Sequence, residues 1–154
     1  TTADHALLTP AMVAYFCRGS LASGAAVTAG LTASATLLAR YPESKRTYLK
    51  FRDERYSGSN LFALRAPEAM ALPRLWRRIE QQRKQPWRVA AVFGPWLLLG
   101  YLLRVFTLDQ AMARISARLG VRVAAVVMPM AEAAIDVDKA EDLELVNRIL
   151  GEGA

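Results

Sequence analysis

Apolar and polar positions follow one another with periods that change between those of helices and strands. Thr9-Pro10 is typical of a helix start, because threonine can cap a helix and proline suits its first position. Either Gly19 or Gly24 would end this helix. The uncharged residues 26–31 then predict a short buried strand. The first part of the chain is therefore expected to fold as a helix followed by a strand.

Residues 48–52 alternate in a way that predicts a half-buried strand. Leu49 and Phe51 would point toward the core, while Lys50 and Arg52 would share the outer face. An outer face with two basic side chains is suited to binding a phosphate group, with arginine offering a bidentate fork. A solvated basic face explains the pattern equally well.

The rest of the chain continues the alternation of strands and helices. It contains a strand at residues 60–64, a helix capped by Thr107 and Gln110, a strand at 121–128 and a final amphipathic helix at 140–150. The capping residues match the reciprocal pattern of a capping box. Because strands alternate with helices, the predicted fold class is α/β, with a mostly parallel sheet covered on both faces.

Composition is that of one globular domain, residues 1–154, with 53% hydrophobic and 22% charged residues. The formal net charge of +6 favours an anionic partner, such as a nucleotide, a phosphorylated small molecule, nucleic acid or an anionic membrane. The one cysteine, Cys17, lies among apolar residues and is expected to be a packed core thiol. A single thiol allows no disulfide framework, so a reducing, cytoplasmic location is expected.

A basic and apolar helical insertion is predicted at about residues 67–120. It contains an arginine-rich helix at 74–84 and an uncharged apolar segment at 89–103, which Gly94-Pro95 interrupts. The apolar segment is shorter than the roughly 20 residues that a membrane-spanning helix needs. A buried helix pair or apolar flap, a membrane-surface segment and a homo-oligomer interface remain alternatives for it.

Two aspartates are the candidates for metal chemistry. Asp4 and Asp136 are each expected just after a strand, where ligands bind in α/β sheets. Mg²⁺ takes one or two protein carboxylates and completes its coordination with phosphate oxygens and water. Asp138, with Glu141 three residues later, is instead interpreted as the cap of the last helix.

Three segments resemble motifs of one enzyme family. Residues 134–145, Ala-Ile-Asp-Val-Asp-Lys-Ala-Glu-Asp-Leu-Glu-Leu, resemble the C-terminal signature of the MobA-like (molybdopterin-guanylyltransferase-like) nucleotidyltransferases, Asp/Asn-hydrophobic-Asp/Asn-Thr-Pro-Glu-Asp-Leu. Residues 2–10 resemble the family's Asp-x-Pro-hydrophobic metal motif, and residues 56–62 resemble its Thr-Gly-Gly-Asn segment near the acceptor substrate. The three matches occur in family order and span nearly the whole chain.

The resemblance implies a Rossmann-like three-layer sheet of the nucleotidyltransferase (GT-A-like) type. It implies Mg²⁺-dependent transfer of a nucleotidyl group from NTP, with GTP or CTP expected, to a phosphorylated small-molecule acceptor, releasing pyrophosphate. Asp4 and Asp136 would be the catalytic residues that hold Mg²⁺. The acceptor would be bound by Lys50, Arg52, Gly58 and Asn60.

The sequence departs from the family pattern in three places. Ala6 replaces a proline, and Lys139-Ala140 replaces a Thr-Pro pair. No glycine-rich segment with a suitably placed lysine is present to bind a triphosphate. The chain is therefore expected to be the C-terminal part of a nucleotidyltransferase domain whose N-terminal nucleotide-binding half is missing, and to be inactive alone.

Other function classes compete with this hypothesis. A membrane-surface or partner-binding module would use the basic helix 74–84 and the apolar segment 89–103. A glycosyltransferase of related fold is a further alternative, because Asp136-Val137-Asp138 is formally an Asp-x-Asp motif. Nucleic-acid binding is not expected, because the basic residues lack interleaved aromatic side chains and no DNA-binding motif is present.

Overall fold

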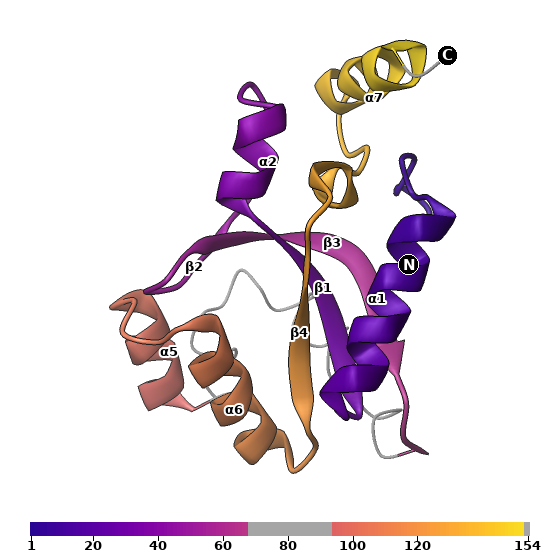
Figure 1. The fold of residues 1–154 in the computed structure, drawn as a ribbon. Helices are drawn as coiled ribbons and strands as arrows, with labels where there is room; N and C mark the ends of the chain where they lie inside the picture. The colour runs from indigo at the N-terminus through magenta and orange to yellow at the C-terminus, as the bar shows by residue number, and fades with distance from the viewer. Residues whose placement is uncertain (68–93, 153–154) are drawn as a thin grey trace.

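Four strands form one mixed sheet in the computed structural model, which describes residues 1–67 and 94–152 (Figure 1). The strand order is β2 (Leu49–Lys50), β3 (Arg55–Leu64), β1 (Val27–Ala33) and β4 (Val123–Met128). β1 runs parallel to β4 and antiparallel to β3, and β3 runs antiparallel to β2. The predicted α/β class is confirmed.

The expectation of a mostly parallel sheet is wrong. Two of the three strand pairings are antiparallel. β2 and β3 are joined by a short turn in which the Phe51 N–H donates to the Glu54 carbonyl over 3.0 Å. Parallel neighbours need a crossover of a dozen or more residues, so strands joined this closely must run in opposite directions.

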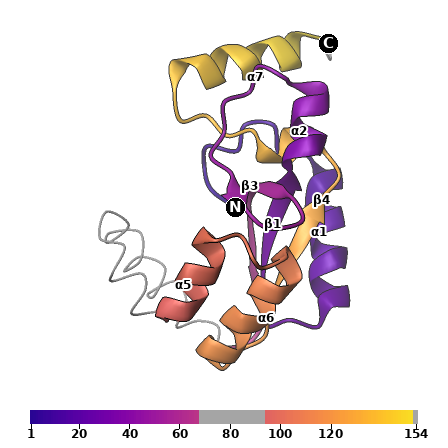
Figure 2. The same cartoon turned by 90° about the vertical axis from the view of Figure 1, so that its left-hand side faces the viewer.

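Helices cover both faces of the sheet (Figures 1 and 2). On one face, α1 (Pro10–Ser23) packs Met12 and Phe16 against Val126 and Met128 of β4. The other face is covered by α5 (Pro95–Leu102) and α6 (Leu108–Leu119), whose side chains form a cluster with β1 and β3. Because strand side chains alternate between the two faces, the helices form separate cores above and below the sheet.

The predicted ends of α1 and the predicted start of α6 are confirmed. Thr9 Oγ1 accepts the Met12 N–H over 3.3 Å, and Gly24 ends α1 in the left-handed conformation at φ 62°. Thr107 and Gln110 form both halves of the capping box of α6. Gly120 ends α6 at φ 67°, a backbone conformation that glycine adopts without strain.

Cys17 is exposed, so the prediction of a packed core thiol is wrong. α1 buries Met12, Phe16 and Ser20, which recur every four residues along one helix face. Cys17 follows Phe16 directly and is therefore turned about 100° away from that face.

The strand predicted at residues 48–52 is shorter than expected. β2 contains two residues, Leu49 and Lys50, and Arg52 lies beyond it in the turn. Phe51 is buried, but Leu49 is 42% exposed instead of pointing toward the core. Leu49 and Phe51 do not point the same way because β2 ends at Lys50, between them, and the alternation of a regular strand ends with it.

Three helical elements meet at one end of the sheet, at the top of Figure 1. They are α2 (Ser34–Arg40), the 3-10 helix η2 (Ala131–Ala134) and α7 (Ala140–Glu152). Beneath them lies a buried apolar cluster of Leu7, Leu37, Tyr41, Ala131, Ala134, Ile135, Leu145 and Val146. This cluster supports the two loops that carry Asp4 and Asp136.

Part of the predicted insertion lies outside the described residues. This applies to the basic helix 74–84 and to residues 89–93 of the apolar segment. The described remainder of the apolar segment forms α5 together with the residues on either side of it, Gly94 and Leu103. No helix within residues 1–67 and 94–152 is long and apolar enough to cross a membrane.

Candidate metal centre

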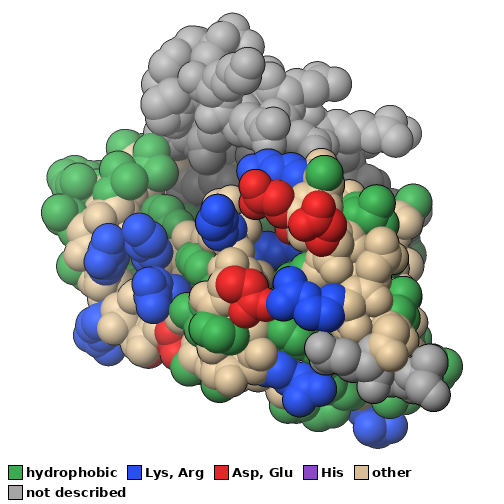
Figure 3. Space-filling model, turned by 90° about the horizontal axis from the view of Figure 1, so that it is seen from above, with side chains coloured by type: hydrophobic (Ala, Val, Ile, Leu, Met, Phe, Trp, Pro, Cys, Tyr) green, Lys and Arg blue, Asp and Glu red, His purple; other side chains and the backbone are tan. Residues whose placement is uncertain are grey.

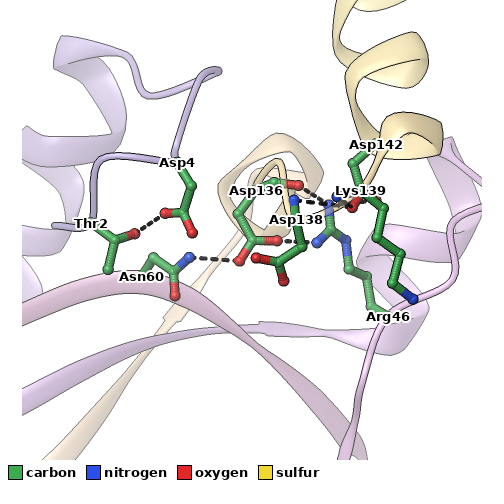
Figure 4. A network of polar contacts seen from close by, with 8 residues as sticks. All are labelled: Thr2, Asp4, Arg46, Asn60, Asp136, Asp138, Lys139 and Asp142. Carbon is green, nitrogen blue, oxygen red and sulfur yellow. Dashed lines mark hydrogen bonds and ion pairs between the residues drawn. The ribbon is translucent and has the colours of Figure 1, made fainter.

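Three carboxylates converge at the end of the sheet where η2 and α7 meet. Asp4, Asp136 and Asp138 each offer an oxygen, and these atoms all lie within 4.8 Å of one another (Figure 4). Asp4 and Asp136 are 132 positions apart in the sequence, yet the fold brings both predicted side chains together. Seen from above, acidic side chains gather in the middle of this face, with Lys and Arg side chains beside them (Figure 3).

The donor set fits Mg²⁺ in chemistry and in size. Mg²⁺ prefers oxygen ligands at about 2.1 Å, so two opposite ligands lie about 4.2 Å apart. The carboxylate oxygens, within 4.8 Å of one another, are close to that spacing without a large movement of the chain. Thiolate and imidazole ligands, which favour zinc and copper, are absent from the described acidic group.

Neither aspartate follows a strand in the described residues, so that part of the prediction is wrong. Asp4 lies in a turn, and residues 131–134 before Asp136 form η2 instead of a strand. The two loops are joined directly, because the Val137 N–H donates to the Asp4 carbonyl over 3.0 Å. Leu7 and Ile135 pack in the same buried cluster and hold the loops from below.

Asn60 contacts the acidic group from within β3. Its Nδ2 donates to Asp136 Oδ2 over 2.7 Å. Asn60 has a φ of 50°, and the pairing of β1 with β3 is irregular here, because Gly30 alone stands opposite residues 59–61. A bulge of this kind re-aims a side chain, and asparagine is one of the few residues that tolerates a positive φ.

Arg46 holds Asp136 from the opposite side. The Arg46 side chain is only 8% exposed. Its Nη1 donates to Asp136 Oδ1, and its Nη2 donates to the Asp136 carbonyl oxygen over 2.5 Å. The same Nη2 lies 3.4 Å from Asp142 Oδ1. One guanidinium therefore contacts the side chain and the main chain of Asp136 together with the first turn of α7.

Asp142, not Asp138, provides the carboxylate that binds backbone N–H groups just before α7. Asp142 Oδ2 accepts the N–H groups of Asp138 and Lys139 over 3.2 and 3.0 Å. The contacts expected of an Asp138 cap, with N–H groups inside the first turn, are not among the hydrogen bonds of the described residues, and Asp142 instead reaches back from α7 to the two residues before the helix. The Asp138 carboxylate instead lies with Asp4 and Asp136 in the acidic group.

His5 is a buried neighbour of the acidic group, at 7% exposure. Burial lowers the pKa of His5, although the nearby carboxylates of Asp136 and Asp4 act in the opposite direction. Neither ring nitrogen makes a hydrogen bond of ordinary geometry with the described part of the chain. Burial therefore favours the neutral imidazole, which leaves the negative charge of the carboxylates in place.

The predicted acceptor-binding residues are spread over two regions. Asn60 touches the acidic group, and Gly58 is exposed two residues earlier in β3. Lys50 and Arg52 lie beside α5, where their backbone N–H groups donate to Tyr101 Oη and to the Phe106 carbonyl over 3.4 and 2.8 Å. Among the contacts of the described residues, neither basic side chain reaches the carboxylates.

Sequence reasoning missed Arg46 and Asp142. Arg46 acts through residues distant in sequence and lies in no motif, whereas Asp142 stands at the aspartate of the signature's Glu-Asp-Leu but was assigned no site role. Asp138 had a detectable signal, because residues two apart in an extended segment point the same way, as Asp136 and Asp138 do. That signal was outweighed by the capping pattern.

No family model matches the chain, and no curated protein matches its sequence. Among solved structures, the chain is similar to a hypothetical transferase from Thermus thermophilus, with 36% sequence identity and a TM-score of 0.74. The chain shares its fold with this transferase. The match covers 88% of the chain and 58% of the transferase, so the chain spans little more than half of that protein's length.

Proposed function

We propose that the chain carries the metal-binding part of an Mg²⁺-dependent nucleotidyltransferase. One observation carries the proposal: the fold assembles Asp4, Asp136 and Asp138 into one group of carboxylates. Two of these three side chains stand at the metal positions that the MobA-like resemblance implies. The shared fold with a hypothetical transferase supports group transfer as the reaction class.

Nucleotidyl transfer requires positioning and charge compensation more than covalent catalysis by the protein. An oxygen of the phosphorylated acceptor attacks the α-phosphorus of NTP, and the bond to the pyrophosphate leaving group breaks. When bound, Mg²⁺ neutralises phosphate charge and orients the two substrates. Asp4, Asp136 and Asp138 hold the metal, while Asn60 and Arg46 fix the direction of the Asp136 carboxylate.

The substrates are proposals that rest on the resemblance. GTP or CTP is the proposed donor, and Gly58 and Asn60 are proposed contacts for a small phosphorylated acceptor. Lys50 and Arg52 lie farther along β2 and its turn, so they suit an extended acceptor that reaches toward α5. The glycine-rich loop that the resemblance implies has no counterpart in the 154 residues.

A calorimetric titration of MgGTP, MgCTP and MgATP into the complete gene product tests this function. We expect one of the three nucleotides to bind in preference to the others. Asp136→Ala should abolish pyrophosphate release, because it removes a metal ligand. Normal turnover by that variant, or no binding of any nucleotide, would contradict the proposal.

A second candidate function rests on the apolar face of α5. Trp96, Leu99 and Leu102 are 80%, 45% and 65% exposed. Their spacing of three residues places them on one side of the helix, and Leu103 adds a further exposed side chain. We propose that this face binds the surface of an anionic bilayer, as a tryptophan and leucines beside basic residues would allow.

Charge favours a bilayer over self-association for this face. Lys50 and Arg104 lie close to α5, as their backbone N–H contacts with Tyr101 show, and Arg52 contacts Phe106 in the segment after α5. A second copy docked on the same face would bring like charges together, whereas an anionic lipid surface would attract them. Peripheral membrane contact is therefore preferred to a homo-oligomer, and the cytoplasmic location expected from the single cysteine stays a prediction.

Sedimentation with vesicles tests the second candidate. We expect binding to vesicles containing phosphatidylserine but not to pure phosphatidylcholine, with loss of binding as salt is raised. The double variant Trp96→Ser and Leu102→Ser should abolish it. No binding at low salt would remove this candidate, and dimerisation that the double variant prevents would identify a second copy as the occupant.

A further inference from the structure

We infer that Arg46 is the positioning residue of the metal centre, setting the direction in which the Asp136 carboxylate points. This inference rests on the proposed metal-binding function. Arg46 lies outside every motif that resembles the nucleotidyltransferase family, and its backbone belongs to the loop between α2 and β2. Its side chain is nonetheless almost completely buried against the acidic group, at 8% exposure.

The geometry of the contact fixes both parts of Asp136. Nη1 of Arg46 binds the carboxylate, and Nη2 binds the carbonyl oxygen of the same residue. Asn60 Nδ2 holds the other carboxylate oxygen over 2.7 Å. With both oxygens engaged from opposite sides, rotation of the carboxylate is restricted, while lone pairs on each oxygen stay available to a metal.

Asp142 in turn fixes Arg46. Its Oδ1 lies 3.4 Å from Arg46 Nη2, and its Oδ2 accepts the N–H groups of Asp138 and Lys139. Arg46 is therefore tied to the same helix start that carries Asp138. Partners of this kind, which orient a metal ligand without touching the metal, typically affect metal affinity by 10- to 100-fold.

Electrostatics and positioning predict opposite changes in metal affinity when Arg46 is removed, which makes the inference testable. Arg46 places a positive charge beside a site for a cation, so its removal should strengthen metal binding if charge alone matters. If orientation of Asp136 matters more, removal of Arg46 should weaken binding. In a variant that folds, a loss of affinity on removing a positive charge therefore indicates lost geometry.

Titration with Mn²⁺, followed by the electron paramagnetic resonance signal of the free ion, measures this directly on the 154-residue chain. We expect Arg46→Gln to bind Mn²⁺ at least tenfold more weakly, a loss of about 1.4 kcal/mol. Arg46→Lys should be similarly weakened, because lysine keeps the charge but cannot form the fork. The control Arg148→Gln removes an exposed arginine of α7 paired with Glu43, and should match the wild type.

A second readout needs no metal. In nuclear magnetic resonance spectra, the side-chain amide of Asn60 should be shifted and protected by its bond to Asp136 in the wild type and in Arg148→Gln. Arg46→Gln should lose that signature, because Asp136 is no longer held in place. If Arg46→Gln does not fold, Asp142→Asn is the second variant. It keeps Arg46 and a side-chain oxygen that can accept the N–H groups before α7, but it removes the charge that holds the guanidinium. The Asn60 amide should then show a smaller change of the same kind.

The outcomes distinguish a failure of the positioning role of Arg46 from a failure of the proposed metal-binding function. Unchanged or tighter Mn²⁺ binding by Arg46→Gln overturns the positioning role while the metal centre stands. An unchanged Asn60 amide in Arg46→Gln, or in Asp142→Asn where that variant is needed, overturns it as well. If the wild type binds no Mn²⁺, the proposed metal function fails, and the Asn60 amide alone decides whether Arg46 positions Asp136.

Discussion

Asn60 and Asp136 are joined by a hydrogen bond of 2.7 Å between Nδ2 and Oδ2, although they lie 76 residues apart. The bond depends on a backbone irregularity in β3, where Asn60 has a φ of 50° inside an otherwise extended strand. A regular strand would place this side chain toward one face of the sheet. The bulge instead directs the amide to the loop that carries the candidate metal ligand.

Two substitutions at Asn60 separate backbone conformation from side-chain contact. Asn60→Gly removes the amide but suits a positive φ, whereas Asn60→Ala removes the amide and also strains the backbone. We expect both variants to bind Mn²⁺ more weakly to the same extent. Asn60→Ala should in addition be less stable than Asn60→Gly by about 1 kcal/mol in urea denaturation. Equal stabilities would mean that the bulge relaxes at little cost.

Gly30 is the residue of β1 that the bulge requires. A Cβ at this position would lie 3.1 Å from Leu61 Cβ and 3.3 Å from Ser59 Cβ. We expect Gly30→Ala to lower the free energy of unfolding by about 1–3 kcal/mol, the usual cost of overpacking. Gly58→Ala is the matched control, because a Cβ there meets no atom within 4 Å. A destabilisation of equal size in the control would show that strand glycines, not the bulge, are responsible.

Glu132 makes stability depend on pH. Burial alone would raise the pKa of Glu132, but hydrogen bonds from Tyr41, from the Glu132 backbone and from Arg40 together outweigh burial and hold the pKa below its ordinary value. Tyr41 Oη and Arg40 Nε donate to Glu132 Oε1 over 2.6 and 2.8 Å. Because the folded pKa is depressed, this stabilisation is present above the unfolded pKa of about 4.3 and is lost as pH falls through the folded value.

The corresponding variant is Glu132→Gln. Its deficit in the free energy of unfolding relative to the wild type should be largest at neutral pH and should shrink as the pH falls below about 4.3. Urea denaturation at several pH values measures this difference. Glu144→Gln, which alters an exposed carboxylate of α7, should show no such trend. A deficit that does not change with pH would mean that Glu132 acts through shape instead of charge.

Local signals in the sequence predicted those features that neighbouring residues determine. Thr9 and Gly24 mark the two ends of α1, and Thr107 with Gln110 caps α6. These features could be predicted because caps depend on residues three or four positions apart. Asp4 and Asp136 were predicted from their expected positions after strands and from the motif resemblance. The two side chains were expected to lie close together because each would follow a strand. In the structure, the loops that carry them are instead joined by a hydrogen bond from the Val137 N–H to the Asp4 carbonyl.

Features that depend on tertiary contacts could not be predicted in this way. The direction of β3 follows from a short turn, yet its bulge opposite Gly30 leaves no periodic trace in the sequence. Arg46 sits in a loop without a motif, and its burial arises only when α7 packs over it. Cys17 was misplaced because an apolar neighbourhood does not specify which face of a helix is buried.

The most direct test of the account is calorimetric titration of Mg²⁺ into the 154-residue chain and its Asp136→Asn variant. We expect the wild type to bind Mg²⁺ and the variant to bind it at least tenfold more weakly, about 1.4 kcal/mol. Asp109→Asn, which alters an exposed carboxylate of α6, controls for the loss of one negative charge and should bind Mg²⁺ like the wild type. Equal affinities of the wild type and Asp136→Asn, or no binding by either, would contradict the metal centre.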